Sequence, residues 1–219
     1  MYVYTIIRLP RRTLSLHIHE NGELEVRAPR YVPERIIRRF VDSKQEWIEK
    51  TRQKLATAPK SKKPTYQEGE AFRLGGREYS LHITDGNAIV LTPTKLFFPK
   101  KFLVRPTYHM EAFCRTFAKQ FLTHRLDFYA KKMNVSYKRI SIRDTTSRWG
   151  SCSNTGTISF SYRLIVAELP IIDYVVIHEL AHLTYHHHKP SFWAHVATHY
   201  PDYIAARTWL RREGHTLKI

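Results

Sequence analysis

The pentapeptide at residues 178–182 reads His-Glu-Leu-Ala-His and lies in the apolar stretch 171–183. Residues four positions apart share one face of an α-helix, so His178 and His182 can offer two imidazoles to one metal ion. Glu179 follows the first histidine and would stand beside the open coordination position, where a general base is needed. The spacing therefore predicts a helix that carries a zinc site, and with it a zinc-dependent hydrolase, in particular a peptidase.

The segment that carries this motif has two other interpretations. Its β-branched residues Val175, Val176 and Ile177 are also typical of a buried strand. A helix whose histidines face the solvent would need no metal ion. Pro170, however, suits the first turn of a helix, and two histidines inside an apolar helix are costly to bury unless a metal compensates. We therefore expect a helix with a metal site.

A catalytic zinc ion usually has three protein ligands, and the motif does not fix the third. The downstream candidates are one glutamate, one aspartate and six histidines: Glu213, Asp202, His186, His187, His188, His195, His199 and His215. In a continuous helix, His188 would lie about 9 Å along the axis from His182 and on another face. It becomes a ligand only if the helix ends near residues 185–187. The proline at position 190 favours such an end, because the residue before a proline avoids the α conformation.

Four sequence patterns extend the motif in both directions. They are Arg-Trp-Gly-Ser-Cys-Ser at 148–153, Tyr-Arg-Leu at 162–164, His-Glu-Leu-Ala-His at 178–182 and His-Lys-Pro-Ser-Phe-Trp at 188–193. Together they resemble the YgjP-like metal-dependent hydrolases, relatives of the SprT-like and other minimal gluzincin-type peptidases, most strongly over residues 107–214. The resemblance implies an α+β fold with a zincin-like core, in which His178, His182 and His188 bind one zinc ion and Glu179 is the base. It does not imply a particular substrate.

The chain departs from the pattern of that family at two positions. His187 stands where the family usually has asparagine, and histidine is likewise a residue type that accepts a sharp turn. Lys189 stands where the family usually has serine. The lysine places a cation beside the expected site and leaves any role of that serine without support.

The segment Trp149-Gly150-Ser151-Cys152 is expected to form an edge strand beside the metal. Such a strand can pair with an extended peptide substrate through main-chain hydrogen bonds. Gly150 would allow a close approach of the backbone, and Trp149 would form a wall of the cleft. Cys152 has no base assigned to it by nearby sequence, so we interpret it as part of the strand wall and not as a nucleophile. Together with Ser151, these residues are the predicted substrate-binding set.

The hydrophobic pattern divides the chain into three regions. Residues 1–64 predict a β-hairpin with a turn at Asn21-Gly22, a helix that starts at Pro33, and a linker rich in lysine and proline at 58–64. Residues 65–106 predict a small β region, and residues 107–219 predict the zincin-like catalytic domain.

Individual elements follow from the periodicity of apolar residues. In the small β region, strands are expected near 71–74, 78–83, 88–91 and 102–104. In the catalytic region, we expect a long helix at 107–133, strands at 139–143, around 149 and at 157–161, the motif helix, and shorter helices near 190–199 and 201–213.

The chain carries a net charge of +17, from 36 Lys and Arg against 19 Asp and Glu. A basic protein of this kind attracts nucleic acids, nucleotides or acidic proteins. No zinc-finger, helix-turn-helix or RNP pattern accompanies the charge. Two alternatives to a peptidase therefore stay open. One is a metal-dependent hydrolase of a phosphate-containing substrate such as a nucleotide, and the other is a nucleic-acid-binding protein with a structural zinc.

The cysteine content and the hydropathy bear on the cellular compartment. Cys114 and Cys152 form no Cys-x-x-Cys pair and indicate no disulfide framework, which fits a reducing cytoplasm. No run approaches the roughly 18 apolar residues that span a membrane, and the first residues do not have the pattern of a secretory signal. We expect a cytoplasmic protein whose partner is a peptide or protein substrate.

Overall fold

The computed structural model describes residues 2–19, 21–57, 64–145, 147–217 and 219. The chain forms two compact units, Met1–Lys60 and Ser61–Ile219. The predicted linker at 58–64 lies, except for its last residue, outside the described residues. Each helix in the described part of the chain is too short or too polar to cross a bilayer.

The first unit is a small sheet that packs against helices. Its strands β1 (Tyr4–Leu9), β2 (Ser15–Ile18) and β3 (Leu24–Pro29) lie in the order β1-β3-β2, and the helices are α1 (Glu34–Asp42) and α2 (Gln45–Thr57). The predicted hairpin is confirmed, because β2 and β3 pair antiparallel and Gly22 adopts a φ of +83° in the turn between them. The buried core of this unit comes from β3 and both helices: Leu24, Val26, Ala28, Ile37, Val41 and Ile48.

The single helix predicted from Pro33 is wrong, because the structure divides it in two. The Ser43 hydroxyl donates to the carbonyl of Phe40 at 2.8 Å, and the amide of Lys44 bonds to Val41 at 3.0 Å, three residues back. Such a tightened turn and a serine that binds the backbone both compete with continued helix. The apolar pattern continues across the break and therefore did not reveal it.

The second unit begins with a four-stranded sheet in the order β4-β5-β7-β6. Its strands are β4 (Ala71–Leu74), β5 (Arg77–Thr84), β6 (Val90–Leu91) and β7 (Lys95–Pro99). The strand predicted at 102–104 is wrong, since Lys100–Val104 forms a 3₁₀ helix. The strand of that region is β7 instead, where Phe98 is fully buried and Pro99, which lacks an amide hydrogen, is the last residue.

The predicted α+β class is confirmed by the elements that follow. Helix α3 (Pro106–Met133) precedes a second sheet of β8 (Arg139–Arg143), β9 (Gly150–Cys152) and β10 (Thr157–Ser161), in the order β8-β10-β9. Helices α4 (Leu169–Ala181), α5 (Pro190–His199) and α6 (Tyr203–Glu213) complete the unit. A proline stands in the first turn of α3, α4 and α5, where its missing amide hydrogen costs no helical bond.

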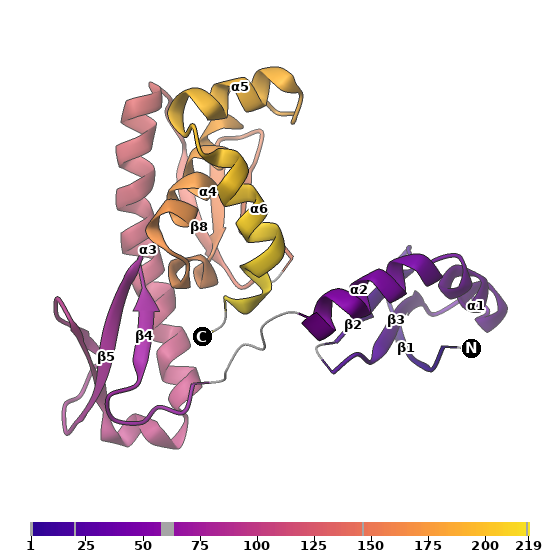
Figure 1. The fold of residues 1–219 in the computed structure, drawn as a ribbon, viewed down its shortest axis with the longest axis horizontal. Coiled ribbons are helices and arrows are strands. Elements are labelled where there is room, and N and C mark those ends of the chain that lie inside the picture. Colours follow the sequence, from indigo (N-terminus) through magenta and orange to yellow (C-terminus); the bar gives the residue numbers. More distant parts are fainter. Residues whose placement is uncertain (1, 20, 58–63, 146, 218) are drawn as a thin grey trace. The chain divides into compact units, whose positions relative to one another are not determined.

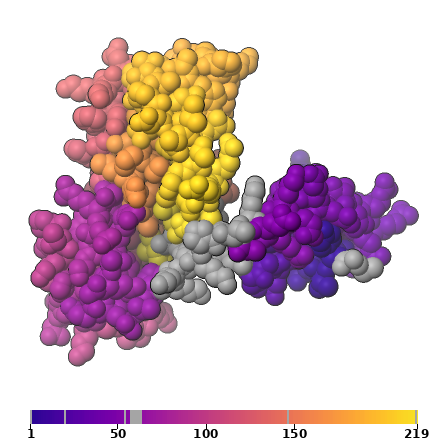
Figure 2. Space-filling view, in the orientation of Figure 1, coloured from indigo at the N-terminus to yellow at the C-terminus, as the bar shows by residue number. Residues whose placement is uncertain are grey.

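Helix α3 runs along the second unit, with β4 and β5 beside one end and β8 and α4 toward the other (Figure 1). The small β region and the region from residue 107 onward share one buried core, which extends from Phe72 and Leu81 to Phe160 and Val176. Helices α5 and α6 lie at the surface of this unit (Figure 2). Within the second sheet, β9 is an edge strand, and it contacts α4.

A buried ion pair fixes α4 against α3. Asp173 on α4 is 7% exposed and accepts hydrogen bonds from Nε and Nη2 of Arg125, both at 2.7 Å, and from the Tyr129 hydroxyl at 3.0 Å. This two-pronged arrangement satisfies a carboxylate that would otherwise be costly to bury. Because Asp173 lies five residues before His178, the pair also sets the rotation of the helix that carries the motif.

Candidate metal centre

Helix α4 ends at Ala181, one residue before the second histidine of the motif. The amides of Leu183 and Thr184 bond to carbonyls three residues back, at 3.0 and 3.2 Å, which closes the last turn tightly. The helix therefore stops earlier than the stop expected near residues 185–187. The chain then reverses and brings His188, just before α5, back to the end of α4.

Three imidazoles converge at this reversal. Nε2 of His188 lies 3.1 Å from Nε2 of His182 and 3.1 Å from Nε2 of His178. One nitrogen from each ring falls within 4.8 Å of the others. Two ligands of a tetrahedral zinc ion, each about 2.05 Å from the metal, lie about 3.3 Å apart. The donor atoms are therefore spaced as zinc requires, and His188 is the downstream histidine that joins the motif pair.

Ordinary hydrogen bonds do not account for this cluster. A neutral imidazole carries one N–H group, and Nδ1 of His182 lies 2.9 Å from the carbonyl oxygen of Tyr185, which accepts that proton. Nε2 of His182 then carries no proton, and its lone pair points at the cluster. A histidine that binds a metal usually has this arrangement, with its other ring nitrogen bonded to a carbonyl. Nε2 of His188 can donate to at most one of its two neighbours. A cation shared by the three rings satisfies all of these lone pairs.

Trp193 on α5 holds the loop that carries His188. Its indole Nε1 donates a hydrogen bond to the carbonyl of His188 at 3.0 Å, and its ring stacks on the His188 imidazole with centroids 5.6 Å apart. On α6, Tyr203 stacks on the same indole at 5.4 Å, and the guanidinium of Arg207 lies 4.3 Å from its centroid. Helix α6 thus supports the third ring indirectly. No motif in the sequence marks Tyr203 and Arg207; their spacing of four residues, which places them on one helical face, was the available signal.

Burial keeps the three imidazoles in the neutral form that binds metals. Burial first, and then the neighbouring His182 and His188, lower the pKa of His178 to about 3. Burial also lowers the pKa of His182 and of His188. Because a ligating histidine must be deprotonated, the rings are ready to accept a cation over a wide pH range.

Glu179 lies where α4 meets β9. It is 5% exposed, and burial raises its pKa to about 8 although Arg148 acts in the opposite direction. A Cβ atom at Gly150 would lie 2.5 Å from Oε1 of Glu179 and 2.6 Å from its Cγ. Only glycine leaves room for the carboxylate at this position. The strand backbone and the candidate base are therefore in direct contact.

A cavity of about 270 Å³ opens beside the imidazoles and Glu179. It is lined by the end of α4, the loop that follows, and β9: Gly150, Ser151, Cys152, Asn154, His178, Glu179, His182, His186 and His188. Three members of the predicted substrate-binding set thus lie at the cavity. Asn154 and His186 also line it; His186 was one of the candidates for the third ligand, whereas no motif in the sequence had marked Asn154.

Trp149 and Cys152 differ in their surroundings. The indole of Trp149 does not line this cavity but packs on Gly214, where a Cβ atom would lie 3.1 Å from its Nε1. Burial, and then the charge of Glu179, raise the pKa of the Cys152 thiol to about 11. A thiol that stays protonated at neutral pH is a poor nucleophile, which agrees with a wall position for Cys152.

Asp144, immediately after β8, is held by two arginines. It accepts hydrogen bonds from Arg163 and, at 2.6 Å, from Nη2 of Arg115. Both guanidinium groups also lie over the ring of Tyr162, at 4.1 and 4.5 Å from its centroid. Tyr162 and Arg163 belong to the Tyr-Arg-Leu pattern at 162–164. That pattern therefore has a structural basis, because it secures the end of β8 in the sheet that also contains β9.

The three-ring site predicts a selective loss of metal binding. Replacing His188 with alanine should lower the affinity for zinc by more than the roughly 10–100-fold that the loss of an outer hydrogen bond causes. His187→Asn is the matched control. The Lys189 amide now donates a hydrogen bond to Nδ1 of His187 at 3.3 Å, and the asparagine side-chain oxygen can accept that bond instead. Competition with a chromophoric chelator measures both variants. Wild-type affinity in His188→Ala would contradict the assignment.

The burial of Glu179 predicts a pH-dependent effect on stability in the metal-free protein. Its pKa is about 8 in the folded state against 4.5 when unperturbed, so between these values the folded state binds the extra proton. The resulting stabilisation is complete below pH 4.5 and is lost as the pH rises through 8. Glu179→Gln stays neutral, so its stability relative to the wild type should increase across this window, by up to about 1.4 kcal/mol per unit of pKa shift.

Urea unfolding with chelator present, at pH 5 and at pH 9, measures this difference. The exposed Glu168, which pairs with Arg73 at the start of α4, supplies the control Glu168→Gln. The control should show no comparable trend. A stability difference between Glu179→Gln and the wild type that is independent of pH would contradict the raised pKa.

Comparison with known proteins places the chain in a family. Among solved structures, it is similar to the metallopeptidase zymogen of Pyrococcus abyssi abylysin, with 24% identity, a TM-score of 0.36, and coverage of 42% of this chain and 97% of that chain. This likeness is too weak to inform on fold or activity, and no curated protein matches. The model of the YgjP-like metallopeptidase domain, however, matches residues 12–213. Since this match spans most of the sequence, the chain belongs to the YgjP-like metallopeptidase-domain family.

Proposed function

We propose that this metal-dependent hydrolase cleaves peptide bonds, with one zinc ion held by His178, His182 and His188 and with Glu179 as the general base. The observation that carries the proposal is the convergence of three imidazoles beside a buried carboxylate at the wall of a cavity. A zinc ion bound there supplies a Lewis acid that polarises a carbonyl group and acidifies water. Three protein ligands leave a coordination position open, as catalytic sites do.

Glu179 is the acidic residue among those that line the cavity. Its carboxylate accepts a proton from the attacking water and passes it to the nitrogen of the leaving amine. Burial makes this carboxylate a stronger base than an exposed glutamate, and the charge of a divalent cation nearby offsets part of that effect. The contact with Gly150 limits the positions that the carboxylate can take.

Strand β9 supplies an edge on which an extended peptide can dock. The backbone groups of Trp149, Ser151 and Ser153 face β10, as the register and the flanking bonds of 2.9 Å show. In an antiparallel ladder, the residues in between direct their backbone groups the other way. The N–H and C=O groups of Gly150 and Cys152 therefore face the free edge beside the cavity. A substrate strand that pairs there would place a peptide carbonyl at the imidazole cluster.

Nucleotide hydrolysis is the rival that the net charge of +17 favours. A nucleic-acid-binding protein with structural zinc is the other, and it requires four protein ligands. Within the described residues, three histidines share the cluster. Incubating the zinc-loaded protein with unfolded proteins and with nucleoside triphosphates, with and without chelator, separates these functions. Chelator-sensitive turnover of nucleotides alone would overturn the peptidase proposal.

Replacing Glu179 with glutamine tests the base directly. The variant should keep its zinc, because the imidazoles are intact, and should lose peptide hydrolysis by about 100-fold or more. Zinc content and turnover are measured on the same sample. Glu168→Gln, at the other end of α4, should retain both zinc and activity. A Glu179→Gln variant that hydrolyses peptides normally would refute the assignment of the base.

Replacing Gly150 with alanine tests the contact between β9 and the base. The added methyl group would meet the Glu179 carboxylate at 2.5 Å, so the side chain must move away from its working position. A misplacement of about 1 Å can lower turnover by about 100-fold, and we expect a loss of this order in kcat with zinc content unchanged. Gly86→Ala is the control, because its new methyl group would meet only the end of the Thr84 side chain. Normal kcat in Gly150→Ala would contradict the proposed role.

A further inference from the structure

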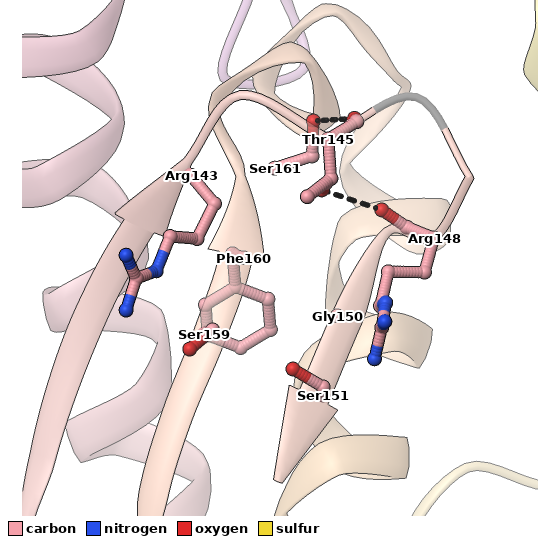
Figure 3. Close-up of a pocket in the computed structure, with 8 residues that line it drawn as sticks. All are labelled: Arg143, Thr145, Arg148, Gly150, Ser151, Ser159, Phe160 and Ser161. Carbon is pink, nitrogen blue, oxygen red and sulfur yellow. Dashed lines mark hydrogen bonds between the residues drawn. The ribbon is translucent and has the colours of Figure 1, made fainter. Parts of the chain in front are cut away.

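A second cavity, of about 290 Å³, adjoins the metal centre on the outer face of the β8-β10-β9 sheet. It is lined mainly by polar side chains: Arg143, Thr145, Arg148, Gly150, Ser151, Ser159, Phe160 and Ser161. Figure 3 shows Arg143 extending from β8 and Arg148 from the segment before β9, with Ser159 and Ser151 between them. Gly150 and Ser151 line both cavities, so the two spaces meet at the edge strand.

Neither arginine of this cavity forms an ion pair in the part of the chain that the structure describes, although the charge of Arg148 acts on Glu179. The nearest acid in sequence, Asp144, is already engaged by Arg115 and Arg163. The hydroxyl groups of Ser151 and Ser159 likewise have no partner among the described residues. The cavity therefore combines unneutralised positive charge with hydrogen-bond donors. This is the chemistry that recognises an anionic group, and arginine in particular matches a planar carboxylate.

The register of the sheet connects this cavity with a docked peptide. Ser151 on β9 pairs with Ser159 on β10, and side chains of paired residues share one face of a sheet. A substrate residue opposite Ser151 would therefore direct its side chain to the outer face, beside Arg148. Its immediate neighbours, opposite Gly150 and Cys152, would direct theirs toward α4 and the imidazoles. One peptide strand can thus contact the metal centre and this cavity at the same time.

The direction of the peptide decides which of its residues reaches the cavity. Thr145 and Arg148 precede β9, so the cavity lies toward the start of that strand. A peptide that pairs antiparallel with β9 runs the other way, and its later residues lie at this end. In this antiparallel orientation, the cavity is entered by a residue that follows the scissile bond.

We propose that this cavity is a specificity site that binds an acidic side chain, aspartate or glutamate, on the C-terminal side of the scissile bond, with Arg148 and Arg143 as its cations. The inference rests on the proposed peptidase function and names its substrate class. The net charge of +17 also favours acidic substrates, because it attracts acidic chains and repels basic ones. A phosphoryl group on a peptide has related chemistry, so the test distinguishes it from a carboxylate.

Internally quenched peptides that differ at one position after the scissile bond provide the test. That position holds glutamate, glutamine, lysine or phosphoserine, and kcat/KM is measured for each. The wild type should favour glutamate over its isostere glutamine by about 10-fold, as expected for a charge-assisted bond in a partly enclosed site, and should disfavour lysine. A stronger preference for phosphoserine than for glutamate would overturn the carboxylate assignment.

Arginine variants assign the preference to this cavity. Arg148→Gln and Arg143→Gln should each reduce the ratio of kcat/KM for the glutamate and glutamine peptides. Arg139→Gln is the matched control, because Arg139 lies on β8 four residues before Arg143 and on the same face, but does not line the cavity. The ratio cancels any influence of Arg148 on Glu179, since both peptides use the same base. An unchanged ratio in both variants would overturn the proposal.

A binding measurement tests the preference for glutamate independently of peptide hydrolysis. Zinc-loaded Glu179→Gln should bind the fluorescently labelled glutamate peptide more tightly than the glutamine peptide by anisotropy, and the added Arg148→Gln change should remove the difference. If the wild type cuts no peptide, the proposed function fails and this inference with it. If it cuts all four peptides equally, the peptidase proposal stands and the specificity site is wrong.

Discussion

The early end of α4 is the constraint on which the candidate metal centre depends. With a helix rise of about 1.5 Å per residue, every further turn would carry the chain away from His178 and His182. Because α4 stops at Ala181, His188 returns to within 3.1 Å of both rings. Two hydrogen bonds hold this reversal in place. His182 donates to the carbonyl of Tyr185, and the Trp193 indole donates to the carbonyl of His188. The proposed ligand set is therefore a property of the reversal as much as of the motif.

Sequence periodicity could predict one half of this site and not the other. His178 and Glu179 lie on α4, and His182 follows its last residue with a helical backbone conformation, so local geometry relates the three before any tertiary contact is known. His188 lies beyond the helix end, where no periodicity holds, and spacing alone left it one of several histidines. Only the resemblance to a family implied it. The expected stop near 185–187 was late because it was inferred from the proline at position 190, whereas closure of the last turn depends on backbone bonds that composition does not encode.

The support of the site was equally hidden from the sequence, for a different reason. Tyr203 and Arg207 act through Trp193, and Asp173 through Arg125, which lies 48 residues away in the chain. Such contacts arise only when helices pack together. The split between α1 and α2 and the placement of β7 show the same limit on a smaller scale. In each case a hydrophobic pattern fixed which residues are buried, while hydrogen bonds and chain reversals fixed where an element ends.

Strand β9 shows how one short element can serve two faces of a site. Its inward position at Gly150 has no side chain, and that absence lets the Glu179 carboxylate lie against the backbone. The next residue, Ser151, faces outward and lines the cavity that holds Arg143 and Arg148. Since successive residues of a strand point to opposite faces, a shift of register by one would bring either Ser151 or Trp149 to the place of Gly150, with a side chain directed at the candidate base. The register of β9 against β10 thus couples the chemistry on one face to the charge on the other, and a peptide added at the edge would contact both.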